Sequence, residues 1–111
     1  MFTNRVQVAQ VCRVLTRGVA REPLFGASGP SHAALALRAQ PPSSVSGGDR
    51  ALLELAFWFW EGGTSPRVAT LLELMDRTQL RMLGTLWLAL ADGQAAIERW
   101  IKANGGPVGE A

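Results

Sequence analysis

Residues 52–60 read LLELAFWFW, and this nearly unbroken apolar stretch is the feature that most restricts the fold. Glu54 is its one charged side chain, and its last four residues are aromatic. On a helix, one face would carry Leu52, Leu55, Ala56 and Phe59, and the adjacent face would carry Leu53, Phe57 and Trp60. Because this apolar arc is wider than a surface helix needs, we expect a central helix that packs against other elements on several sides.

Start and stop signals predict two short helices in the first part of the chain after residue 45. Ser46 and Asp49 have the spacing of a capping box, which predicts a helix over residues 49–60. The Gly62-Gly63 pair ends this helix, because glycine accepts the left-handed conformation that helix C-termini prefer. The Ser65-Pro66 pair then has the form of an N-cap and a first helical residue, and it predicts a second helix of about ten residues.

Two further helices are expected in residues 76–103. Asp76 and Gln79 form another capping-box pattern, which opens a helix that continues to about residue 90. One face of this helix carries Leu80, Leu83, Gly84, Trp87 and Ala91. The Asp92-Gly93 pair separates it from a fourth helix that ends near residue 104. The predicted fold class is all-α, with a compact bundle of about four short helices in residues 46–103 and a flexible tail at 104–111.

The segment before residue 46 has a different composition. Residues 1–22 contain a predicted basic amphipathic helix, with an apolar stripe on one side and Arg13, Arg17 and Arg21 on nearly the opposite side. An extended conformation for residues 5–15 is the alternative, because valine also favours strands. Residues 23–45 are rich in Pro, Gly and Ser and predict a connector, within which residues 31–39 have the pattern of a short helix capped by Ser31.

The residue types present exclude several kinds of chemistry. Cys12 is the one cysteine and His32 the one histidine, so a single chain cannot assemble an internal disulfide or a four-ligand Cys/His metal site. No constellation of nucleophile, base or paired acids stands out, and we expect no enzymatic activity, no cofactor and no metal. Residues 46–93 resemble a pattern found in short prokaryotic proteins, in which a helix that ends in Trp-x-Gly leads to a pair of helices. That resemblance implies no catalytic motif.

The surplus of apolar side chains favours an interaction function. A module the size of residues 46–103 buries only about 60 % of its unfolded surface, so this apolar surface needs further cover from residues 1–40, from a second copy or from another protein. We therefore expect a non-catalytic protein-protein interaction or regulatory module, homo-oligomeric or part of a larger complex. Trp60 and Trp87 are the expected buried anchors, meeting across a helix crossing at Gly84. The expected contacts to a partner are Trp58, Phe57, Leu53 and Trp100.

The rival hypothesis is a helix-turn-helix nucleic-acid-binding protein, with residues 66–75 and 79–90 as the helix pair. Its contacts to nucleic acid or to another anionic surface would come from Arg13, Arg17, Arg21, Arg77 and Arg81. The arginine-rich N-terminus also resembles a targeting peptide. The longest uncharged apolar run after residue 45, residues 82–91, falls well short of the roughly 20 residues that span a bilayer. Since a lone cysteine agrees with a reducing compartment, we expect a cytoplasmic protein.

Overall fold

The computed structural model of the chain describes residues 4–63 and 66–105. These two ranges contain six helices and one short antiparallel hairpin: α1 (Arg5–Leu15), β1 (Phe25–Gly26), β2 (Gly29–Pro30), α2 (His32–Ala39), α3 (Gly47–Glu61), α4 (Val68–Leu74), α5 (Arg77–Asp92) and α6 (Gln94–Ala103). In the hairpin, Phe25 pairs with Pro30 and Gly26 with Gly29. The expectation of a mostly helical chain is therefore confirmed.

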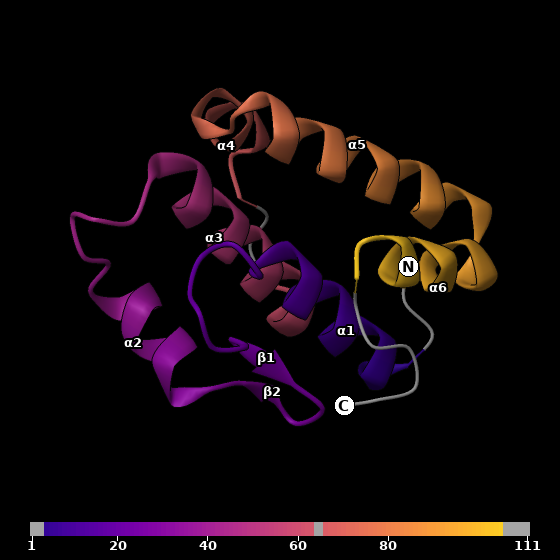
Figure 1. Ribbon diagram of the computed structural model, residues 1–111, viewed down its shortest axis with the longest axis horizontal. Coiled ribbons are helices and arrows are strands. Elements are labelled where there is room, and N and C mark those ends of the chain that lie inside the picture. Colours follow the sequence, from indigo (N-terminus) through magenta and orange to yellow (C-terminus); the bar gives the residue numbers. More distant parts are fainter. Residues whose placement is uncertain (1–3, 64–65, 106–111) are drawn as a thin grey trace.

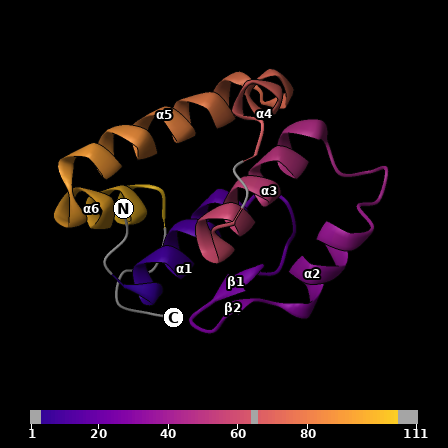
Figure 2. The same ribbon diagram turned by 180° about the vertical axis from the view of Figure 1, so that it is seen from behind.

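Two helices, α1 and α3, lie side by side at the centre of the molecule (Figure 1). The hairpin packs against α1, and α2 packs against α3. On the other side, α5 lies along one edge of the molecule and α6 folds back against it (Figure 1). The view from behind shows α4 and α5 together along one edge (Figure 2). None of the helices in the described ranges has the length and apolar character that crossing a membrane requires.

The hydrophobic core surrounds α3, whose wide apolar arc is covered by several elements. α1 covers part of this arc with side chains that are almost fully buried, Val11, Cys12 and Leu15. The hairpin covers another part, because the rings of Phe25 and Phe57 meet edge to face with centroids 5.3 Å apart. Edge-to-face pairs of this kind contribute about 0.5–1.5 kcal/mol beyond the burial of their area. The expectation of a central helix packed on several sides is confirmed.

Residues 23–45 correct one of the expectations from composition. Residues 24–34 are not loosely packed, because Leu24, Phe25 and Ala34 are buried, whereas residues 38–44 are exposed. The short helix expected here is present, and the Ser31 hydroxyl accepts a hydrogen bond of 3.1 Å from the amide of Ala34. The hydrophobic core therefore draws on segments before residue 46 as well as on α3, α5 and α6.

Two of the predicted helix starts are confirmed by their cap geometry. The Ser46 hydroxyl accepts a hydrogen bond of 3.1 Å from the amide of Asp49. At the start of α5 the capping box is complete: the Asp76 carboxylate accepts from the Gln79 amide at 2.8 Å, and the Gln79 side-chain oxygen accepts from the Asp76 amide at 2.9 Å. The Gln79 side chain also donates to the Asp49 carboxylate at 3.0 Å, which ties the starts of α3 and α5 together.

The other boundaries differ in part from the expectations. α4 begins at Val68 without a side-chain cap and has seven residues, so it is shorter than predicted, and Ser65 lies outside the described residues. α1 is a helix rather than a strand, and its start is capped by Asn4, whose side-chain oxygen accepts from the Gln7 amide at 2.7 Å. Gly93, with φ at +102°, separates α5 from α6 as expected.

Candidate functional site

The packing of α6 decides which side of α5 faces inward. Leu83, Leu86 and Ala89 of α5 are buried. The indole nitrogen of Trp100, a buried residue of α6, donates a hydrogen bond of 2.9 Å to the Thr85 hydroxyl. With these contacts made, the side of α5 that carries Leu80, Gly84, Trp87 and Leu88 is exposed to solvent.

This exposed side of α5 and the neighbouring side of α4 form one apolar surface, which we call the α4–α5 face: Val68, Leu72, Leu80, Leu83, Gly84, Trp87 and Leu88. All of these except Leu88 line a groove of about 390 Å³ between the two helices. Leu88 stands beside the groove and is 68 % exposed. Among the described residues, eight large hydrophobic side chains are exposed, and six of them belong to α4 and α5.

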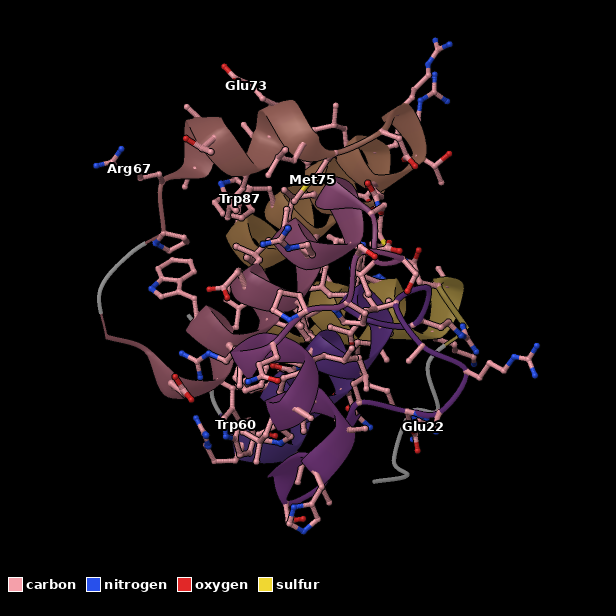
Figure 3. The ribbon with its side chains drawn as sticks, turned by 90° about the vertical axis from the view of Figure 1, so that its left-hand side faces the viewer. Glu22, Trp60, Arg67, Glu73, Met75 and Trp87 are labelled. Atoms are coloured by element: carbon pink, nitrogen blue, oxygen red, sulfur yellow. The ribbon has the colours of Figure 1, made fainter. Side chains whose placement is uncertain are left out.

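The prediction that Trp87 is a buried anchor of the core is wrong. Trp87 is 48 % exposed rather than buried, and Figure 3 shows it close to α4 and α5, far from Trp60. Trp60 is half-buried beside the hairpin, where the Arg5 guanidinium lies 3.7 Å from its ring centroid. The expected crossing at Gly84 is absent for a simple reason. A Cβ placed on Gly84 would meet no atom within 4 Å, so no described part of the chain covers that glycine.

The residues expected to contact a partner are mostly internal. Leu53, Phe57 and Trp100 are at most 5 % exposed and belong to the core, so they offer no surface to a partner in this conformation. The reason is that the hairpin and α2 cover the side of α3 that was expected to remain open, and the Arg38 guanidinium lies 4.5 Å from the Phe57 ring centroid. Trp58 alone is partly accessible, and its ring packs 5.4 Å from that of Phe59.

The structure brings together three of the arginines expected at an anionic surface. Arg13, Arg17 and Arg21 line a hollow of about 200 Å³ at the end of α1. The Arg17 guanidinium donates hydrogen bonds to the carbonyl oxygens of Asn104 and Gly105 at 2.7 and 3.1 Å, so it is engaged with the end of α6. Cations are favourable at helix C-termini, where unpaired carbonyl groups carry partial negative charge. This contact gives Arg17 a structural role.

Cys12 and His32 do not form a catalytic pair. The Cys12 thiol is fully buried and donates a hydrogen bond of 3.2 Å to the carbonyl oxygen of Ala56. Burial raises the pKa of this thiol to about 12, partly offset by the Arg5 charge, so the group stays protonated at neutral pH. His32 is exposed at the start of α2. Within residues 4–63 and 66–105, no group of His, Cys, Asp or Glu side chains is arranged to hold a metal ion.

The α4–α5 face was visible in the sequence only as two apolar stripes. The spacing of Val68 and Leu72 on one helix, and of Leu80, Leu83 and Trp87 on the next, predicts an apolar face on each helix, and of these residues only Trp87 was expected as a buried anchor. A stripe of this kind shows that a helix has an apolar side, but it does not show whether the same chain covers it. Comparisons of the chain with known protein families, curated proteins and solved structures found no match.

Proposed function

We propose that this chain is a small, non-catalytic helical module that binds another protein chain through the α4–α5 face. It acts either as a homo-oligomer or within a larger complex. The observation that carries the proposal is the concentration of exposed large hydrophobic side chains on the α4–α5 face, which holds five of the eight in the described residues: Val68, Leu72, Leu80, Trp87 and Leu88. Scattered apolar residues are normal on a protein surface, but a contiguous apolar groove is typical of an interaction site.

The chemistry of the face agrees with a protein partner. Burying apolar surface is favourable by roughly 25 cal/mol for each Å² removed from water. Trp87 is about half exposed on the face, and tryptophan is enriched among the residues that dominate binding energy. The edge of the face is polar, with Arg67 exposed just before α4, Glu73 exposed on α4 (Figure 3) and Arg81 exposed on α5. An apolar centre with a charged rim is the usual composition of a specific protein interface.

Nucleic-acid binding is the second candidate, because Arg77 and Arg81 are both exposed on α5. Reading of base edges requires free polar side chains on the recognition helix. Two of the polar side chains of α5 are engaged internally, since Gln79 bonds to Asp49 and Thr85 accepts the bond from Trp100. The remaining exposed side of α5 is mainly apolar, and this difference leads us to favour a protein partner.

Photocrosslinking tests the proposal. A photoreactive benzoyl-phenylalanine replaces Leu72 in the α4–α5 face, and a matched variant carries it in place of Leu35, an exposed leucine of α2. We expect the first variant to form covalent adducts with a protein chain in its native cells, and the second to form none. Mass spectrometry identifies the crosslinked chain, whether another copy or a different protein. Absence of protein adducts from Leu72 and also from Leu88 would contradict the proposal.

The nucleic-acid alternative has its own measurement. Binding of the purified chain to duplex DNA and to single-stranded RNA is measured at low salt, where non-specific phosphate contacts are strongest. If the alternative holds, Arg77→Ala together with Arg81→Ala should weaken binding and reduce its salt dependence. The protein-binding proposal expects no such dependence on these two arginines.

A further inference from the structure

Two charges within α5 are placed against the dipole of the helix, whereas the carboxylate of the N-cap residue Asp76 agrees with it. Arg77 lies in the first turn and Asp92 in the last, and α5 has no acidic residue in its first turn and no basic residue in its last. A helix carries partial positive charge at its N-terminus and partial negative charge at its C-terminus, so each of these side chains is unfavourable for α5 alone. Beside an antiparallel copy of α5 the same charges would be favourable, because Arg77 would then lie next to the negative C-terminal end of the neighbouring helix.

The exposed side chains of α5 are also arranged symmetrically about Gly84. Leu80 and Leu88 lie four residues before and after it, and both are exposed. The backbone at Gly84 is open, because a Cβ there would meet nothing within 4 Å. A glycine between two exposed leucines, each one turn away, suits a crossing point at which two helices approach closely.

A helix turns about 100° per residue, and this decides which side chains would meet across a two-fold axis at Gly84. Arg77, Arg81, Leu88 and Asp92 fall on one side of the stripe, and Leu80 and Trp87 fall on the other. In an antiparallel pair related by that axis, each side meets the same side of the neighbour. Arg77 of one copy would lie beside Asp92 of the other, and Leu80 of one copy beside Trp87 of the other.

We propose that the partner of the α4–α5 face is a second copy of this chain, bound in an antiparallel α5–α5 crossing centred on Gly84. This inference rests on the proposed function and names the partner of the same surface. Leu80 of each copy meets Trp87 of the other at the groove, and Leu88, the most exposed large side chain of the face, lies on the other side of the crossing beside Arg81 of the neighbour. The two Arg77–Asp92 contacts and the opposed helix dipoles set the antiparallel direction.

Sedimentation equilibrium of the full-length chain, from micromolar to millimolar concentration, measures the association. We expect a dimer, and we expect Gly84→Glu to shift it to a monomer because it places two carboxylates at the two-fold axis. Glutamate is a better helix former than glycine, so the thermal midpoint of the dilute variant should not fall. The matched control Leu35→Glu removes an exposed leucine outside the face and should leave the dimer unchanged.

Charge reversal tests the direction of the pair without touching the apolar contacts. Arg77→Asp and Asp92→Arg each place a charge that agrees with the dipole of α5 and so stabilises the isolated helix. Each should nevertheless weaken the dimer about tenfold or more at low salt, because like charges would then meet at positions 77 and 92 of the two copies. The double variant carries both reversals and should restore the dimer to within a few-fold of the original. Two weak single variants and a restored double variant would be hard to explain by any other arrangement.

Two outcomes would overturn the inference. One is a dimer that survives Gly84→Glu or is indifferent to both charge reversals, since the crossing would then lie elsewhere. The other is a chain that stays monomeric at millimolar concentration. A monomer whose benzoyl-phenylalanine at position 72 still crosslinks to a different protein leaves the interaction function standing and removes only the self-association. A monomer without any protein adduct removes both.

Discussion

The indole nitrogen of Trp100 lies 2.9 Å from the hydroxyl oxygen of Thr85 and donates a hydrogen bond to it. Thr85 in turn donates to the carbonyl oxygen of Met82 at 2.8 Å, one turn earlier on α5. This chain of two bonds joins α6 to α5 and orients the neighbouring Leu86 into the core, where it is fully buried. The same orientation leaves Trp87 and Leu88 outside, so the exposed α4–α5 face is a consequence of how α6 docks.

Thr85→Val should therefore weaken the fold. It removes the acceptor and leaves the Trp100 N–H unpaired in a mostly buried position, which costs about 1–3 kcal/mol. Urea unfolding followed by circular dichroism measures this loss. Thr70→Val, at an exposed position of α4, is the matched control and should change the free energy of unfolding by no more than about 0.5 kcal/mol. Equal effects of the two variants would show that the Trp100 bond does not hold α6 in place.

The two tryptophans at the C-terminal part of the chain should differ sharply when replaced. Trp100 is 5 % exposed, and Trp100→Ala should lower the free energy of unfolding by about 3–5 kcal/mol. Trp87 is 48 % exposed, and Trp87→Ala should cost only about 1 kcal/mol in dilute solution, where the α4–α5 face is unoccupied. Thermal unfolding at micromolar concentration distinguishes the two. If Trp87→Ala lowers the free energy of unfolding more than Trp100→Ala does, Trp87 rather than Trp100 lies in the core.

Gly29 in the hairpin should not tolerate a side chain. Its φ of +110° is a conformation that L side chains rarely adopt, and an added Cβ would lie 2.5 Å from Cζ2 of the Trp60 indole. Gly29→Ala should cost about 1–3 kcal/mol and displace Trp60 from the Arg5 guanidinium. Gly26→Ala in the same hairpin is the control, because nothing lies within 4 Å of its Cβ position. Thermal unfolding of both variants should show a lower midpoint for Gly29→Ala alone.

Burial of Cys12 makes the free energy of unfolding depend on pH in the alkaline range. The pKa of the thiol is raised from 9.0 in a free chain to about 12 in the folded protein, so between these values the unfolded chain loses a proton that the folded chain keeps. The stabilisation is fully present below pH 9 and declines above it, at up to about 1.4 kcal/mol per pH unit. Urea unfolding between pH 8 and pH 10.5 should show a steeper decline for the original chain than for Cys12→Ala. Parallel curves would mean that the thiol is not buried.

Removal of residues 1–22 should abolish the cooperative fold. α1 covers one side of α3 with Val11, Cys12 and Leu15, and its loss would expose that part of the core to water. Near-ultraviolet circular dichroism and thermal unfolding of the shortened chain should show no sharp transition. Addition of a peptide of residues 4–22 should restore one. A cooperative transition without α1 would show instead that residues 46–103 fold by themselves.

The sequence alone was sufficient for much of the local structure, although not for the hairpin or for the start of α4. The helical class, the caps at Ser46 and Asp76 and the break at Gly93 depend on interactions within a few residues, which the order of side chains already specifies. The wide apolar arc of α3 likewise required a central position, because contact with water is unfavourable over most of the circumference of such a helix.

Only the tertiary structure decided which apolar stripes are covered. The stripe of α1 and the stripe of α5 that carries Trp87 look alike in sequence, yet the first is buried against α3 and the second is exposed. The difference arises from contacts between distant segments. The hairpin around Phe25 covers the side of α3 next to Phe57. The hydrogen bond from Trp100 to Thr85 fixes which side of α5 faces α6. Periodicity reports the amphipathic character of one helix, whereas burial depends on which distant elements pack against it.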